Sequence, residues 1–249
     1  MKHILPVFLF SLIFLATAAA AQQKPTYVIV HGAWGGSWAF KKVDSLLTAG
    51  GAVVYRPSLT GQGERVHLAS LQVGLETHIN DVVNMILYED LQNVILVGHS
   101  YGGMVVTGVA DRVPGRISKL IYLDAFVPEH GESVLSIQGA RADGLMKMAS
   151  NGFLIPVWVK KDQAPPKDVP HPVKTFTDTI QLTNPLRLKI PTTYILTVAK
   201  GTDAKADDFA LQAERARKKN WPVLILEADH NPQWSAPEAF VQMLKKLAN

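Results

Sequence analysis

The chain has 249 residues, of which 47% are hydrophobic and 18% charged, and its formal net charge is +4. This length suits one domain with a sizeable core. The absence of cysteine excludes disulfides, thiolate catalysis and cysteine-based zinc sites. The longest basic cluster, residues 215–219, lies in a helix-like stretch and indicates a solvated face, so we expect no nucleic-acid partner.

The N-terminal residues 1–21 have the pattern of a secretory signal peptide. A short basic start (1–3) precedes an apolar run (4–15) and an Ala-x-Ala cleavage pattern near Ala21. The alternative is a membrane anchor, but the apolar run is shorter than the roughly 20 residues that span a bilayer. We therefore expect cleavage, a mature domain over 22–249 without stable membrane insertion, and a secreted or periplasmic location.

Strand-like apolar runs alternate with helix-like segments along the rest of the chain. Strands that are apolar on both faces and separated by helices indicate a mostly parallel sheet flanked by helices, the α/β class. The expected strands are 26–30, 52–55, 93–97, 119–123, 192–197 and 223–226, and the expected helices are 38–49, 75–88, 102–112, 209–219 and 237–247.

One insertion, from about residue 128 to 189, interrupts this alternation. It is rich in proline, shows no clear strand, and is too long for an ordinary connection, so we expect a cap over the strand ends. Its apolar residues either line a pocket or form a small core of the cap, and the pattern favours neither. The candidate substrate-binding residues are Met146, Phe153 and Trp158 of the cap, together with Trp34 of an earlier loop.

A glycine-flanked serine follows the expected strand 93–97. The segment Gly98-His-Ser-Tyr-Gly102 fits G-x-S-x-G, with a strand before it and a helix after it. The alternative is a plain strand-to-helix turn with a capping serine. The combined pattern favours a nucleophile elbow, in which glycines allow a strained turn that exposes the hydroxyl of Ser100.

A serine nucleophile needs a base and an acid, expected in the order Ser, acid, His. His230 follows the last expected strand and is favoured over His171, which lies in the cap. The acid is either Asp124, which ends an apolar strand, or Asp203, in a polar loop after the fifth strand. We favour Asp124, because a carboxylate in apolar surroundings needs a partner.

Backbone N–H groups near the serine are expected to form an oxyanion hole. Tyr101 follows the nucleophile, and the glycine-rich loop 31–36 is the expected second source. His31 and His99 are interpreted as structural residues that position their turns. The loops lack a phosphate-binding lysine and a full dinucleotide fingerprint, and no metal motif is present, so we expect no cofactor and no metal.

Five short motifs occur together in this chain: His31-Gly-Ala-Trp, Leu59-Thr-Gly-Gln-Gly-Glu-Arg65, Gly98-His-Ser-Tyr-Gly-Gly103, Leu123-Asp-Ala-Phe-Val-Pro128 and His230-Asn-Pro-Gln-Trp-Ser-Ala-Pro-Glu238. They resemble the α/β-hydrolase fold family, and specifically bacterial esterase-like members related to plant methyl esterases and hydroxynitrile lyases. This resemblance covers residues 24–247. It implies Ser100 as nucleophile, His230 as base, and the backbone N–H groups of Ala33 and Tyr101 as oxyanion donors. The family's usual acid position has no clean match, so the resemblance does not decide between Asp124 and Asp203.

The resulting hypothesis is a serine hydrolase that cleaves small carboxylic esters through an acyl-enzyme. One alternative is a C–C lyase similar to hydroxynitrile lyases, which are expected to have a lysine near the base. No lysine neighbours His230 in the sequence. The other alternative is a non-catalytic small-molecule binding protein, because a fold alone does not determine function. The expected partner is a small ester, and the sequence sets no oligomeric state.

Overall fold

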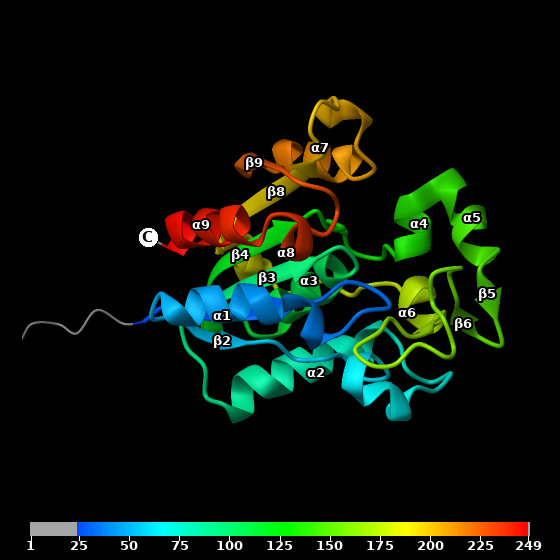
Figure 1. Cartoon of the computed structure of the whole chain (residues 1–249). Helices are drawn as coiled ribbons and strands as arrows, with labels where there is room; N and C mark the ends of the chain where they lie inside the picture. The colour runs from blue at the N-terminus through cyan, green and yellow to red at the C-terminus, as the bar shows by residue number, and fades with distance from the viewer. Residues whose placement is uncertain (1–23, 249) are drawn as a thin grey trace, which may run out of the picture.

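A parallel β-sheet forms the centre of the molecule in the computed structural model, which describes residues 24–248 (Figure 1). The predicted signal peptide, 1–21, lies outside the described residues. Within the described part, six strands pair in parallel in the order β2-β1-β3-β4-β8-β9, which confirms the predicted fold class. These strands are β1 (Thr26–Val30), β2 (Val53–Tyr55), β3 (Val94–His99), β4 (Ile117–Leu123), β8 (Thr192–Val198) and β9 (Val223–Glu227).

Helices cover both faces of the sheet (Figure 1). Helices α1, α8 and α9 lie on one face, and α2, α3 and α7 lie on the other. The predicted helix that begins at residue 38 starts instead with a 3-10 turn, Ser37–Phe40, and becomes α-helical three residues later than expected. The helices are α1 (Lys41–Ala49), α2 (Leu75–Tyr88), α3 (Gly102–Arg112), α7 (Ala210–Lys218), α8 (Pro232–Ser235) and α9 (Pro237–Ala248).

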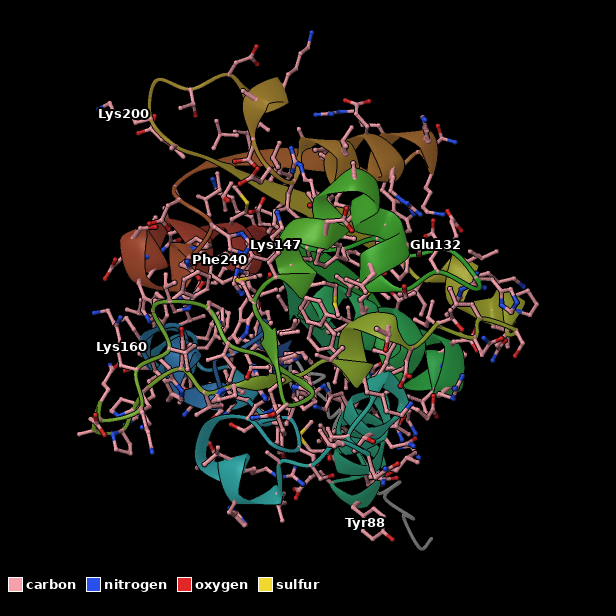
Figure 2. The ribbon with its side chains drawn as sticks, turned by 90° about the vertical axis from the view of Figure 1, so that its right-hand side faces the viewer. Tyr88, Glu132, Lys147, Lys160, Lys200 and Phe240 are labelled. Atoms are coloured by element: carbon pink, nitrogen blue, oxygen red, sulfur yellow. The ribbon has the colours of Figure 1, made fainter. Side chains whose placement is uncertain are left out.

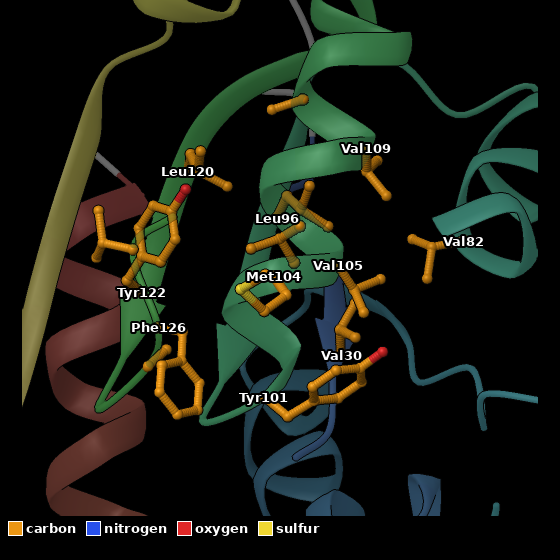
Figure 3. Close-up of a cluster of buried hydrophobic side chains, with 14 of the residues drawn as sticks. Val30, Val82, Leu96, Tyr101, Met104, Val105, Val109, Leu120, Tyr122 and Phe126 are labelled. Carbon is orange, nitrogen blue, oxygen red and sulfur yellow. The ribbon is translucent and has the colours of Figure 1, made fainter. Parts of the chain in front are cut away.

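Successive residues of each central strand pack on opposite faces of the sheet. On β1, Val28 and Val30 join the core against α2 and α3, whereas Tyr27 and Ile29 join the core against α1 and α9. Figure 3 shows part of the first cluster, with Val30 among side chains from β3, β4 and α3. Each such buried aliphatic side chain contributes about 1.5–3 kcal/mol, and together they fix the sheet edge that carries the site.

The segment between β4 and β8 forms a cap at one end of the molecule, which faces the viewer in Figure 2. The sequence of 128–189 shows no clear strand, but the folded segment contains strands. Three two-residue strands form a small antiparallel sheet in the order β5-β6-β7. Strands this short have no detectable alternation of apolar and polar residues. The cap elements are α4 (Val134–Gln138), α5 (Ala142–Met146), β5 (Ala149–Ser150), β6 (Phe153–Leu154), β7 (His171–Pro172) and α6 (Lys174–Thr177).

Hydrogen bonds attach the cap to the loop that follows β1. The indole N–H of Trp34 donates to the Leu154 carbonyl oxygen at 3.1 Å, and the Val169 N–H donates to the Trp34 carbonyl oxygen at 2.8 Å. The cap therefore lies beyond the carboxyl ends of the central strands, beside the predicted oxyanion loop.

None of the helices within residues 24–248 has the length and apolar character needed to cross a membrane.

Candidate active site

Ser100 lies at the sharp turn between β3 and α3. Its φ of 55° is in the left-handed region, which costs a non-glycine residue on the order of 1–3 kcal/mol. The flanking glycines make this turn sterically possible. A Cβ at Gly98 would lie 2.6 Å from Val106 Cγ2, and one at Gly102 would lie 2.7 Å from the Val30 carbonyl oxygen. Close packing thus requires glycine on both sides of the serine.

His230 connects this serine to a carboxylate. His230 Nε2 lies 3.0 Å from Ser100 Oγ, and His230 Nδ1 lies 2.6 Å from Asp124 Oδ2. The histidine is on the loop between β9 and α8, the serine follows β3 and the aspartate follows β4. Parallel strands bring their carboxyl ends to one edge of the sheet, so residues distant in sequence meet there.

Asp124 is buried, with 1% of its surface exposed, and both carboxylate oxygens have partners. Oδ2 faces His230, and Oδ1 accepts the Thr197 N–H at 3.2 Å. The alternative acid, Asp203, is exposed, and its side chain accepts the Lys205 N–H at 2.9 Å. Of the two acids predicted from the sequence, only Asp124 contacts the histidine.

Two rings enclose the imidazole of His230. Phe209 stacks on it with ring centroids 4.8 Å apart and an interplanar angle of 12°, and His99 lies 4.8 Å away at 38°. The Nε2–H of His99 donates to the His230 carbonyl oxygen at 2.8 Å. Burial lowers the pKa of His99 to about 3, so this ring stays neutral. His99 therefore positions the loop of His230 as well as its own turn, a role that the sequence analysis missed.

The loop 31–36 packs directly against the serine. A Cβ at Gly32 would lie 3.0 Å from Ser100 Cβ, so only glycine fits. His31 holds the loop, since Nδ1 lies 2.7 Å from the Gly32 carbonyl oxygen and Nε2 accepts the Leu59 N–H at 3.1 Å. Burial lowers the pKa of His31 to about 4 and keeps it neutral.

One predicted oxyanion donor is adjacent to Ser100 in sequence, and the other is on the loop that packs against Ser100. Tyr101 is the residue before the first turn of α3, and Ala33 follows Gly32. Within residues 24–248, the backbone N–H groups of Ala33 and Tyr101 make no hydrogen bond. The neighbouring Trp34 has a φ of 64° and donates its N–H to His171 Nδ1 at 3.3 Å, which ties this loop to the cap. The two free N–H groups are available to a ligand.

A hollow of about 310 Å³ opens beside Ser100 and His230. Trp34 and Trp158, two of the predicted substrate-binding residues, line it. Trp234 and Asp168 also line it, and the sequence analysis missed both. Trp234 belongs to the C-terminal motif that carried the resemblance, but no sequence signal marks Asp168 among the polar residues of the cap loop.

Met146 and Phe153 do not line this hollow, which corrects the expectation for them. Met146 is on α5 and is 37% exposed. Phe153 is in the small cap sheet, opposite Pro172 of β7. The composition of the chain does not indicate how close the cap strands lie to the loop 31–36 in the folded protein.

A second hollow, of about 370 Å³, lies between the cap helices and α7. Phe126, Met148 and Phe209 line it. Because Phe209 also stacks on His230, this ring lies between the second hollow and the imidazole.

In the described part of the chain, no group of three or more His, Asp or Glu side chains is arranged to hold a metal ion.

Comparison with known proteins agrees with this architecture. A model of the alpha/beta hydrolase family matches residues 27–243. The chain belongs to this family. The predicted resemblance to esterase-like members related to plant methyl esterases is also confirmed.

Three similar proteins illustrate the range of relatives. A carbendazim hydrolyzing esterase from Nocardioides sp. (strain SG-4G) is 54% identical over 111 residues, which are 45% of this chain and 46% of that protein. The pFDCC methylesterase MES16 of Arabidopsis thaliana is 29% identical over 254 residues, covering 89% and 94% of the two chains. An extracellular alpha/beta-hydrolase from a Paenibacillus species has a TM-score of 0.75 at 22% identity, covering 89% of this chain and 98% of that one. This last similarity shows a shared fold.

Proposed function

We propose that the protein is a serine hydrolase of small carboxylic esters that acts through an acyl-enzyme. The observation that carries the proposal is the position of His230, with Nε2 3.0 Å from Ser100 Oγ and Nδ1 2.6 Å from Asp124 Oδ2. Relatives named esterase and methylesterase support the same reaction class. The roles are nucleophile for Ser100, general base for His230 and orienting acid for Asp124.

In the first half of the reaction, Ser100 Oγ attacks the ester carbonyl carbon while its proton moves to His230 Nε2. The carbonyl oxygen becomes an oxyanion, which accepts hydrogen bonds from the N–H groups of Ala33 and Tyr101. Asp124 stabilises the imidazolium through Nδ1–H. Collapse of the intermediate breaks the bond to the alcohol oxygen, and His230 returns the proton to this leaving group.

In the second half, water attacks the acyl-serine. His230 accepts a proton from the water, the oxyanion forms again in the same place, and the acid product leaves as the proton returns to Ser100 Oγ. The hollow beside Ser100 accommodates a small substrate against Trp34 and Trp158. Among the described residues, no lysine lines this hollow, which disfavours the alternative of a lyase that uses a lysine near the base.

The test is hydrolysis of p-nitrophenyl acetate, butyrate and octanoate by the protein and by Ser100→Ala. We expect activity that is lost in Ser100→Ala by a factor on the order of 10³ or more, with the acetate and butyrate preferred. Absence of ester hydrolysis combined with cyanide release from mandelonitrile would support the lyase. Ligand binding without turnover, unchanged in Ser100→Ala, would support the binding protein.

We also propose that the protein is exported and that residues 1–21 are removed. The supporting observation is the basic, apolar and small-residue pattern of this segment. Expression with its own N-terminus, followed by intact-mass measurement of the protein from medium and periplasm, tests this. A full-length mass in the cell membrane fraction would contradict it.

A further inference from the structure

Asp168 is the one acidic side chain among the described residues that line the hollow beside Ser100, and no lysine or arginine lines it. The carboxylate is partly buried, and no charged side chain in the described part of the chain forms an ion pair with it. The adjacent Lys167 donates instead to the Lys161 carbonyl oxygen at 2.8 Å. The hollow therefore contains an uncompensated negative charge.

The main chain holds Asp168 close to the glycine-rich loop 31–36. The next residue, Val169, donates its N–H to the Trp34 carbonyl oxygen at 2.8 Å. Asp168 Oδ1 lies 3.9 Å from where a Cβ would stand at Gly35. Burial raises the pKa of the Asp168 carboxyl, and the nearby Trp158 side chain offsets part of this increase. The carboxylate caps no helix and joins no strand, so the fold does not explain it.

Aromatic rings line the same hollow as this charge. Trp34 and Trp158 meet edge to face, with centroids 5.6 Å apart at 81°. Trp234 forms another wall and stacks on Trp38 at 5.7 Å. Trp158 and Trp234 are each about half exposed, so indole surface faces the opening. Indole faces attract cations through the ring quadrupole, and a nearby carboxylate adds a full negative charge.

We propose that this hollow selects esters that carry a positively charged nitrogen, and that Asp168 is the specificity-determining residue. The inference rests on the proposed ester hydrolysis and narrows its substrate class. The ester carbonyl lies at Ser100, and the cationic group lies between Asp168 and the indoles of Trp34, Trp158 and Trp234. A partly desolvated charge pair of this kind favours the cationic ester over a neutral ester of the same shape by about tenfold or more.

Two pairs of esters of equal shape test this selectivity. Each pair differs only in replacing the cationic nitrogen by carbon: 2-(dimethylamino)ethyl acetate against 3-methylbutyl acetate, and acetylcholine against 3,3-dimethylbutyl acetate. The readout is the ratio of kcat/KM between the two members of a pair at neutral pH. We expect a ratio of about 10 or more for the native protein, falling to about 1 in Asp168→Asn. The cationic ester of the first pair has an N–H donor, and acetylcholine in the second pair has none. Comparing the two pairs therefore separates the effect of a hydrogen bond to Asp168 from the effect of contact with the indole rings.

Asp162→Asn is the matched control, because Asp162 is an exposed acid of the same cap loop that does not line the hollow. We expect it to keep the native ratio. Equal hydrolysis of both members by the native protein would overturn the inference, as would a preference that survives in Asp168→Asn. A purely structural role for Asp168 would lower kcat/KM for both members alike and leave the ratio unchanged.

A binding measurement keeps the inference testable if no ester is turned over. Trp34, Trp158 and Trp234 provide a fluorescence signal in the hollow. In Ser100→Ala, we expect choline to bind at least tenfold more tightly than 3,3-dimethylbutan-1-ol, and the difference to vanish when Asp168→Asn is added. Equal binding of the two alcohols contradicts the inference. Failure of p-nitrophenyl acetate hydrolysis, in contrast, contradicts only the proposed reaction.

Discussion

The orientation of His230 depends on neighbours that act on different atoms of the residue. Asp124 faces Nδ1 at 2.6 Å, His99 donates to the backbone carbonyl oxygen at 2.8 Å, and Phe209 lies against the ring face at 4.8 Å. Only Asp124 places a charge beside the ring nitrogen. An anion there fixes which nitrogen carries the proton and leaves Nε2 free to accept from Ser100.

Asp124→Asn therefore removes the proposed orienting acid with little change of shape. We expect kcat for p-nitrophenyl acetate to fall by a factor on the order of 10³–10⁴, because an amide supports the wrong histidine tautomer. Asp203→Asn is the comparison, since this exposed side chain contacts Lys205 rather than His230. We expect it to keep native activity. A larger loss in Asp203→Asn than in Asp124→Asn would contradict the assignment.

The sequence contains local signals for some of these residues and none for others. Ser100 has its glycines, and His230 has its position after the last strand. The sequence favours Asp124 because an acid at the end of an apolar strand needs a partner. Asp168 has no such signal, since it lies in a polar, proline-rich loop whose path over the site depends on cap folding. The contact between Trp34 and the cap is likewise a property of the folded chain.

At the scale of elements, the junction of β3 with α3 leaves no room for a side chain at Gly98. A Cβ there would lie 2.6 Å from Val106 Cγ2 and 2.7 Å from the Gly102 carbonyl oxygen. We expect Gly98→Ala to lower the free energy of unfolding by about 1–3 kcal/mol, because the strand and helix must separate. Urea denaturation measures this loss.

Gly115 provides the matched control for that substitution. It is exposed, and a Cβ there would meet no atom within 4 Å. We expect Gly115→Ala to change the unfolding free energy by no more than about 0.5 kcal/mol. An equally small loss of unfolding free energy in Gly98→Ala would contradict the prediction, because it would show that the turn has room for a methyl group.

Elements of the central sheet were predictable for a physical reason that does not extend to the cap. The predicted helices 75–88 and 102–112 match α2 and α3 at both ends, because each has apolar residues at helical spacing and flanking glycines or turns. The strands agree within two residues at each end. The two-residue strands β5, β6 and β7 are held by tertiary contacts instead of a repeating pattern, so periodicity could not reveal them.

For the whole molecule, buried histidines link stability to pH. His31, His78, His99 and His171 are buried, and burial lowers the pKa of each. The pKa falls to about 4 for His31 and His78 and to about 3 for His99. In the unfolded chain these groups bind protons near the ordinary value of about 6.5. The unfolded state therefore gains protons first as the solution is acidified.

This difference gives the direction of the pH dependence. The stabilisation gained by burying neutral histidines is fully present above pH 6.5. It is lost as the pH falls toward the pKa of each histidine in the folded state, by about 1.4 kcal/mol per pH unit for each histidine. We expect the unfolding free energy, measured by urea denaturation from pH 7.5 to 4.5, to fall steeply below pH 6.5. His78→Gln is expected to flatten this slope, because Gln does not titrate. His67→Gln, at an exposed position, is expected to keep the native slope. Parallel curves for His78→Gln and the native protein would show that the acid sensitivity has another source.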